Sequence, residues 1–94
     1  EEKDIAGAIA GAGKNLVHFH VSDNDRGVPG SGRVPWDQVV QGLVRAGYDG
    51  WITAEMFVIA GNPASADLNI WRNIEPDADA AARQALAFMN ATFP

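Results

Sequence analysis

The chain has 94 residues, 47% of them hydrophobic and 20% charged, a composition typical of one small globular domain and not of a disordered or membrane-spanning segment. The formal net charge is −5 and the seven Lys and Arg residues are spread along the chain, which argues against a nucleic-acid-binding surface. Because cysteine is absent, disulfides and thiolate metal sites are excluded, and we expect a protein of the reducing cytoplasm. The longest apolar runs fall far short of the ~20 residues needed to span a bilayer, so we expect no membrane partner.

The first part of the chain is predicted to contain the end of a helix and then a strand. Residues 4–13 (DIAGAIAGAG) place apolar side chains at near-helical spacing, and the last glycine would close the helix. Residues 15–22 (NLVHFHVS) alternate apolar residues with His18 and His20, the pattern of a half-buried strand. The polar stretch 23–35 contains GVPGSG and is expected to be a loop.

The clearest helical pattern lies at residues 36–47 (WDQVVQGLVRAG). Pro35 and Asp37 mark the start of this helix, and Gly47 is placed to end it in the left-handed conformation. Its apolar residues recur at intervals of three and four, on Trp36, Val39, Val40, Leu43 and Val44.

A second strand is expected at residues 50–59 (GWITAEMFVI), where β-branched and aromatic residues are bounded by turn-forming residues. Alternation puts Glu55 on one face of this strand together with Trp51, Thr53 and Phe57. An unpaired carboxylate buried in an apolar strand is energetically costly, so Glu55 is expected to have a function.

Two further helices are expected at about 64–74 (ASADLNIWRNI) and at about 77–91, separated by Pro76, with Asp77 as the N-cap of the second. The resulting βαβα order is typical of a parallel α/β sheet with right-handed crossovers. Two parallel strands make a poor sheet by themselves. Residues 1–94 are therefore expected to form a single, partial domain.

His20 and Glu55 would lie near the carboxyl ends of their strands, where α/β folds form ligand sites. Adjacent parallel strands would bring them to one rim, and imidazole with carboxylate is a partial ligand set for a divalent metal. Structural interpretations remain open for the candidates. The histidines can be packed and hydrogen-bonded, Arg26 can be a solvated loop residue, Phe57 can belong to the core, and Asp23 can be an ordinary turn former.

Three segments together resemble the sugar isomerase/epimerase family of xylose isomerase-like TIM barrels: HFHVSDNDRGVPGSGRVPWDQV, GYDGWITAEMF and ADLNIWRNI. The likeness is greatest to the D-tagatose and D-psicose 3-epimerases, which carry the run H-x-H-x-x-x-x-x-R-x-x-P-G-x-G-x-x-P-W and then a Gly-Tyr-x-Gly strand ending in Glu. It implies the C-terminal βαβα part of a (β/α)8 barrel of about 250 residues. Several relatives have Gly-Glu where this chain has Ser22-Asp23, which leaves substrate preference open.

The resemblance also implies a site that holds one divalent metal ion, Mn or Co, with Mg or Zn as alternatives, between two Glu, one Asp and one His. His20 and Glu55 would be the two ligands in this chain, and His18 would be interior packing. Arg26 would bind the substrate, and Phe57 would contact the sugar. The implied reaction is proton transfer at C3 of a ketose through an enediolate, with Glu55 as one of two catalytic glutamates.

The other Glu and the Asp of this site lie outside the matching segments. The isolated chain is therefore expected to be inactive and to need the N-terminal barrel segment, in the same polypeptide or in another chain, with a homo-oligomer expected. One alternative is a hydroxypyruvate isomerase-like enzyme or another small-carbonyl isomerase of the same superfamily. The other is a non-catalytic small α/β module that assembles through exposed strand edges.

Overall fold

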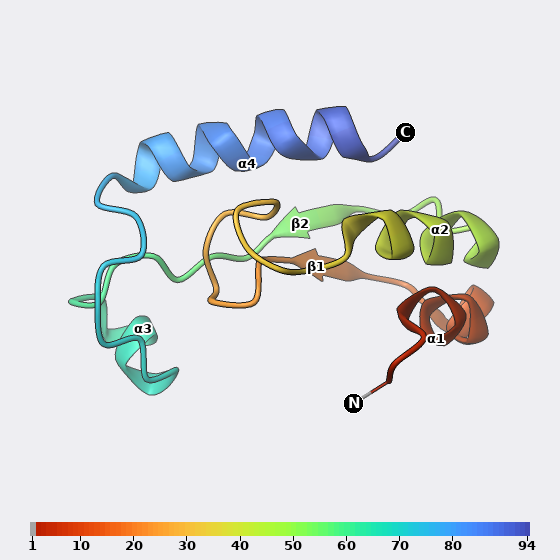
Figure 1. Ribbon diagram of the computed structural model, residues 1–94, viewed down its shortest axis with the longest axis horizontal. Helices are drawn as coiled ribbons and strands as arrows, with labels where there is room; N and C mark the ends of the chain where they lie inside the picture. Colours follow the sequence, from red (N-terminus) through yellow and green to blue (C-terminus); the bar gives the residue numbers. More distant parts are fainter. Residues whose placement is uncertain (1) are drawn as a thin grey trace.

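The computed structural model describes residues 2–94, which contain a two-stranded parallel sheet and several helices (Figure 1). The elements are, in chain order, α1 (Ile5–Ala12), the 3-10 helix η1 (Gly13–Asn15), β1 (Phe19–Val21), α2 (Trp36–Ala46), β2 (Ile52–Ala54), α3 (Pro63–Asp67) and α4 (Ala78–Thr92). In the sheet, Phe19 pairs with Ile52, His20 with Thr53 and Val21 with Ala54. The parallel βαβα arrangement predicted from the sequence is thereby confirmed.

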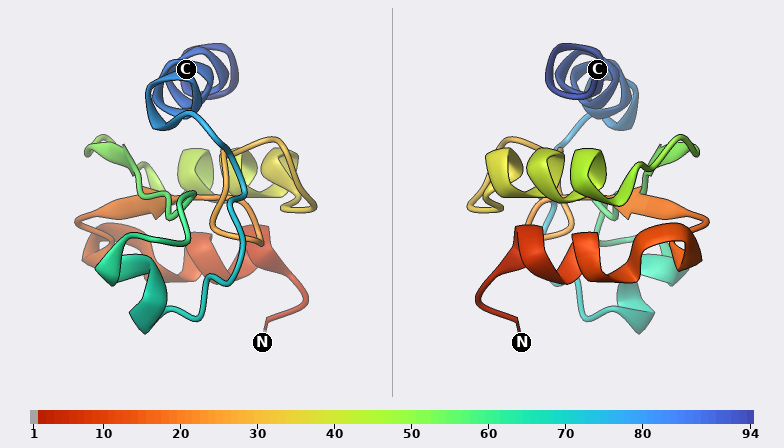
Figure 2. Two further views of the ribbon diagram at one scale, coloured as in Figure 1. Left: turned by 90° about the vertical axis from the view of Figure 1, so that its left-hand side faces the viewer. Right: turned by 90° about the vertical axis from the view of Figure 1, so that its right-hand side faces the viewer.

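The sheet has one covered face and one open face. In the end-on views of Figure 2 the strands lie along one flank, α2 lies beside them, and α4 and α1 lie above and below α2. Val21, on the covered face, is only 3% exposed. On the other face His18, His20, Thr53 and Glu55 are all exposed. The open face is therefore the one that carries the candidate site residues.

Two groups of contacts hold the helices in place. The first is an apolar cluster that joins the loop after β1, the segment after β2 and α4; it consists of Val28, Val58, Ala81 and Ala85, with Ala54, Met56, Ile59 and Ile74 packed against it. The second is the contact between α1 and α2 at Gly42. A Cβ atom at this glycine would lie 2.7 Å from the Cβ of Ile9, so only glycine permits the observed approach.

Helices α2 and α4 begin and end close to the predicted residues. At the end of α2, Gly47 has φ 65°, and its N–H group donates to the carbonyls of Leu43 and Val44. At the start of α4, the side chain of Asp77 accepts hydrogen bonds from the N–H groups of Asp79 and Ala80. The capping residues Gly47 and Asp77 therefore correctly predicted where α2 ends and where α4 begins.

The strands are shorter than the predicted ranges of 15–22 and 50–59, since each has only three residues in the ladder. Within residues 2–94 each strand pairs along one edge only. The apolar pattern continues past the ladder on both sides, but such a pattern indicates which side chains are buried and not how far the backbone pairs, and the ladder joins only residues 19–21 to residues 52–54. The predicted strand boundaries were therefore wrong, although both strands exist.

Two helix predictions also need correction. The helix expected at 64–74 is the five-residue α3, after which Asn69 adopts a left-handed φ of 57° and the chain leaves the helix. The helix expected at 4–13 is not the end of a longer one, because the Asp4 side chain accepts a hydrogen bond from the N–H of Gly7 (2.8 Å) and caps α1.

Candidate functional site

His20, in β1, and Glu55, the residue after β2, lie together at the carboxyl ends of the two strands. The register places His20 opposite Thr53. The Glu55 N–H group donates to the carbonyl of Val21 (2.9 Å), which extends the pairing one residue past β2. As a result, Nδ1 of His20 lies 3.1 Å from Oε2 of Glu55. The structure thus brings together the two residues that the sequence placed on one rim.

The Glu55 carboxylate is neither buried nor unpaired. The side chains of His20 and Glu55 are 44% and 45% exposed, because nothing within residues 2–94 covers this face of the sheet. The premise that the Glu55 carboxylate is unpaired is therefore wrong, whereas its burial concerns a face of the sheet that residues 2–94 leave open. What distinguishes Glu55 is its position beside an imidazole at the strand ends.

His18 contacts His20 directly. The two Nε2 atoms are 2.7 Å apart, and the rings meet edge to face with centroids 4.6 Å apart. Since Nδ1 of His20 faces Glu55, the opposite ring nitrogen faces His18. Within residues 2–94 His18 is exposed and lies in a position to orient the His20 ring. The prediction that His18 packs in the barrel interior concerns a face of the sheet that these residues leave open.

Arg26 and Phe57 are joined through the backbone. The Phe57 N–H group donates to the Arg26 carbonyl (2.9 Å), so the loop after β1 lies against the segment after β2. Arg26 is exposed and has φ 68°, a left-handed conformation that is uncommon for a residue with a side chain. Phe57 is half-buried. Both predicted substrate-binding residues are therefore placed at the same end of the sheet as Glu55.

Asp23 is the residue that sequence reasoning missed. It is 3% exposed, and its carboxylate accepts hydrogen bonds from three backbone N–H groups and from the indole of Trp36. Burial by itself would raise the pKa of Asp23, but hydrogen bonds from backbone N–H groups, among them those of Asn24 and Val34, and from the Trp36 indole lower that pKa from 3.8 to about 2. The neighbouring glycines and prolines indicated a loop and gave no sign that one carboxylate organises it.

The spacing of His20 and Glu55 fits that of two neighbouring ligands of a divalent metal ion. Two neighbouring ligands of an octahedral ion, each about 2.1 Å from it, are about 3 Å apart. The 3.1 Å between Nδ1 of His20 and Oε2 of Glu55 agrees with this spacing, and imidazole with carboxylate suits Mn, Co or Zn. Within the described residues, no group of three or more His, Cys, Asp or Glu side chains gathers to hold a metal. The pair is thus a partial ligand set.

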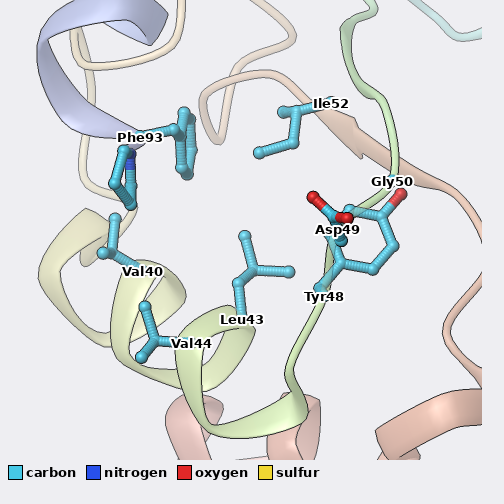
Figure 3. A pocket seen from close by; sticks show the side chains of 9 residues that line it. Val40, Leu43, Val44, Tyr48, Asp49, Gly50, Ile52 and Phe93 are labelled. Carbon is cyan, nitrogen blue, oxygen red and sulfur yellow. The ribbon is translucent and has the colours of Figure 1, made fainter.

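A hollow of about 130 Å³ lies on the covered side of the sheet, between α2, β2 and the end of the chain (Figure 3). Its walls are mostly apolar and include Val40, Leu43, Tyr48, Ile52 and Phe93. None of the candidate site residues lines it, so the hollow is separate from the pair at the strand ends.

The imidazole and the carboxylate lie at the carboxyl ends of adjacent parallel strands, which is where barrel and open-sheet α/β enzymes place their active sites. The chain belongs to the xylose isomerase-like TIM barrel family, which matches residues 1–92. It is similar to D-psicose 3-epimerase of Agrobacterium fabrum, with 40% identity in an alignment 93 residues long that covers 94% of this chain and 32% of that protein. The family predicted from the sequence motifs is confirmed.

Solved structures show the same likeness. A D-psicose 3-epimerase structure determined in the presence of D-fructose matches with a TM-score of 0.88 and 37% identity, over 98% of this chain and 34% of that one. The D-psicose 3-epimerase of Clostridium cellulolyticum H10 with D-tagatose matches with a TM-score of 0.85 and 36% identity, over 98% and 32%. The chain therefore spans about a third of the length of these relatives, which are isomerases. No helix within residues 2–94 has the length and apolar character of a membrane span.

Proposed function

We propose that this chain forms about a third of a metal-dependent ketose 3-epimerase and contributes two metal ligands and one catalytic carboxylate to it. The observation that carries the proposal is the contact of His20 Nδ1 with Glu55 Oε2, 3.1 Å apart at the ends of adjacent parallel strands. The relatives support the substrate class, because they are named for D-psicose and their structures were determined with D-fructose and D-tagatose.

Glu55 is the base or the acid of the proposed proton transfer. One carboxylate takes the proton from C3, the C–H electron pair forms a C2–C3 double bond, and negative charge develops on the C2 oxygen. A second carboxylate returns a proton to the opposite face of C3 and completes the epimerisation. A divalent cation held in part by His20 and Glu55 supplies positive charge that stabilises the developing negative charge.

Arg26 and Phe57 orient the sugar in this proposal. The guanidinium of Arg26 carries several N–H donors and can hydrogen-bond more than one hydroxyl or carbonyl oxygen of a ketose. Phe57 offers an apolar surface to the carbon skeleton. Because the Phe57 N–H donates to the Arg26 carbonyl, the two residues keep a fixed separation along the rim.

The open sheet face requires further strands for activity. His20 and Glu55 are almost half exposed, whereas a reaction with a developing negative charge needs a site that excludes water. The remaining metal ligands and the second carboxylate must come from the other β/α units of the barrel. We therefore expect no epimerase activity from residues 1–94 by themselves.

The test is a chimera in which residues 1–94 replace the matching third of the Agrobacterium fabrum D-psicose 3-epimerase. With Mn²⁺ and D-fructose we expect conversion to D-psicose. Glu55→Gln should lower kcat by about 10²–10⁴-fold, the range typical of a lost general acid or base. Glu2→Gln, the same change at an exposed residue outside the helices and strands, is the control and should leave kcat unchanged.

Three outcomes would contradict the proposal. A folded chimera without epimerase activity would show that this chain does not supply the proposed residues. Near-parental turnover of the Glu55→Gln chimera would show that Glu55 has no catalytic role. A chimera that isomerises hydroxypyruvate in preference to the ketohexoses would favour the other isomerase of the superfamily.

A further inference from the structure

The loop between β1 and α2, residues 22–35, carries Arg26 and is built around one buried carboxylate, that of Asp23. We propose that Asp23 is a positioning residue of the site, whose carboxylate holds this loop in the conformation that presents Arg26 to the substrate. The inference rests on the function proposed above, because the substrate contact of Arg26 belongs to that function.

Both carboxylate oxygens of Asp23 are fully engaged. Oδ1 accepts from the backbone N–H groups of Asn24 (2.9 Å) and Val34 (3.2 Å), which lie near the two ends of the loop. Oδ2 accepts from the N–H of Gly30 (2.9 Å) and from the indole Nε1–H of Trp36 (3.2 Å). One side chain therefore ties the start, the middle and the end of the loop to each other.

The backbone of Asp23 fixes the short turn that contains Arg26. The Arg26 N–H donates to the Asp23 carbonyl (3.0 Å), and the Asp23 N–H donates to the Gly27 carbonyl (3.1 Å). Within this turn Arg26 has φ 68°, a conformation that a non-glycine residue keeps only where its surroundings enforce it. The position of Arg26 is thus set by the residue whose side chain anchors the rest of the loop.

The side chain of Asp23 is itself held in place through contacts with α2 and α4. Trp36, which donates to Asp23, begins α2 and packs edge to face against Phe88 of α4, with ring centroids 5.3 Å apart. Gly30 also meets α4, because a Cβ atom at this glycine would lie 2.4 Å from the Phe88 ring. Asp23 therefore joins the Arg26 turn to a part of the molecule that does not face the substrate.

Only a carboxylate at position 23 accepts all of these hydrogen bonds. An amide has one accepting oxygen, and its NH₂ group would face donors such as Gly30 and Trp36. Asp23→Asn keeps the volume of the side chain and removes half of its accepting capacity. It therefore tests the hydrogen bonds while leaving the packing unchanged.

The decisive experiment is a double-mutant cycle in the chimera with Mn²⁺ and D-fructose. Asp23→Asn should raise KM by about tenfold and leave kcat within about twofold, because it displaces a group that binds the substrate. Arg26→Ala should raise KM by a similar or larger factor. If Asp23 acts through Arg26, adding Asp23→Asn to Arg26→Ala should change KM by less than about twofold, whereas a separate structural role would multiply the two effects.

Matched variants keep the cycle interpretable. Asp37→Asn makes the same change at an exposed carboxylate in the first turn of α2 and should leave KM unchanged. Trp36→Phe keeps an aromatic ring against Phe88 and removes one of the four donors, so it should raise KM by a smaller factor. If Asp23→Asn fails to fold, Trp36→Phe takes its place in the cycle with Arg26→Ala.

A second measurement does not depend on activity. Hydrogen–deuterium exchange of the 94-residue chain should be faster in Asp23→Asn for peptides from the loop, 22–35, and unchanged for peptides from α4. Multiplicative KM effects in the cycle, or unchanged exchange in the loop, would overturn the role of Asp23. An inactive chimera would overturn the proposed function, while faster exchange confined to the loop would still show that Asp23 anchors it.

Discussion

His18 shows how a neighbouring side chain can orient a proposed metal ligand. Its Nε2 atom lies 2.7 Å from Nε2 of His20, on the far side of the ring from Glu55. Metal-bound histidines usually have a hydrogen-bond partner at the second ring nitrogen, and loss of that partner weakens metal binding by about 10–100-fold. We therefore expect His18→Phe in the chimera to raise the Kd for Mn²⁺ by at least about tenfold, measured by calorimetric titration.

His18→Gln is the matched variant for this prediction. Glutamine can again offer a polar atom to His20, so it should restore part of the affinity that phenylalanine removes. Equal Kd values for the parent, the Phe variant and the Gln variant would show that His18 does not orient His20.

Asp23 should also make stability depend on pH. Its folded-state pKa of about 2 lies below the ordinary 3.8, so the carboxylate stabilises the folded chain above pH 3.8 and this contribution is lost as pH falls toward 2. The shift corresponds to about 2 kcal/mol. We expect the difference in unfolding free energy between the parent and Asp23→Asn to shrink by about this amount between pH 5 and pH 2, measured by urea denaturation of the 94-residue chain.

Comparing the parent with Asp23→Asn isolates the contribution of Asp23 to stability, because every other carboxylate titrates in both proteins. A difference that stays constant from pH 5 to pH 2 would mean that the Asp23 hydrogen bonds do not persist in solution.

At the scale of single residues, the sequence identified those whose position follows from strand geometry. His20 lies in β1, next to its last residue, and Glu55 directly follows β2, and parallel pairing brings the carboxyl ends of the two strands together. Asp23 could not be recognised, because three of its four donors are loop backbone groups whose directions depend on the folded loop. The exposure of Glu55 could not be inferred either, since it depends on what covers the sheet.

At the scale of elements, the close contact between α1 and α2 is possible because Gly42 has no side chain. A Cβ at Gly42 would lie 2.7 Å from the Ile9 Cβ and 3.0 Å from the Ala6 carbonyl oxygen. Gly42→Ala should therefore destabilise the 94-residue chain by about 1–3 kcal/mol in urea denaturation, despite the higher helix propensity of alanine.

Gly11→Ala is the matched control within α1. A Cβ at Gly11 meets nothing within 4 Å, so only the propensity term remains, and this variant should be more stable than the parent by about 0.5–1 kcal/mol. Destabilisation of both variants by the same amount would contradict the close approach of the two helices at Gly42.

The elements differ in how far the sequence determined them. The boundaries of α2 and α4 were predictable, because Gly47 and Asp77 act within one turn of their own position. The boundaries of the strands and of α3 were not, because they depend on tertiary contacts. The length of each strand depends on how far the other strand pairs with it, and α3 ends where Asn69 turns the chain toward Val58, whose carbonyl accepts from Ile74.

At the scale of the whole molecule, the open face of the sheet indicates where the rest of the barrel lies. Trp51 precedes β2 by one residue and alternates onto the face of Thr53 and Glu55, and it is 83% exposed. In a closed barrel this face points to the interior, which is filled by side chains. An indole so exposed is therefore expected to become buried when the remaining strands are added.

Trp51 consequently provides a fluorescence test of assembly. When the 94-residue chain is mixed with the separately produced remainder of the Agrobacterium fabrum relative, in which Trp residues have been replaced by Phe, we expect a blue shift of tryptophan emission. Trp51→Phe in this chain should remove the shift. Trp71→Phe should preserve it, because Trp71 is equally exposed, at 84%, but lies in the loop after α3 and not on the sheet. If Trp71→Phe removed the blue shift and Trp51→Phe preserved it, the docking surface would lie at the loop after α3, and the open face of the sheet would not be the interior of the barrel.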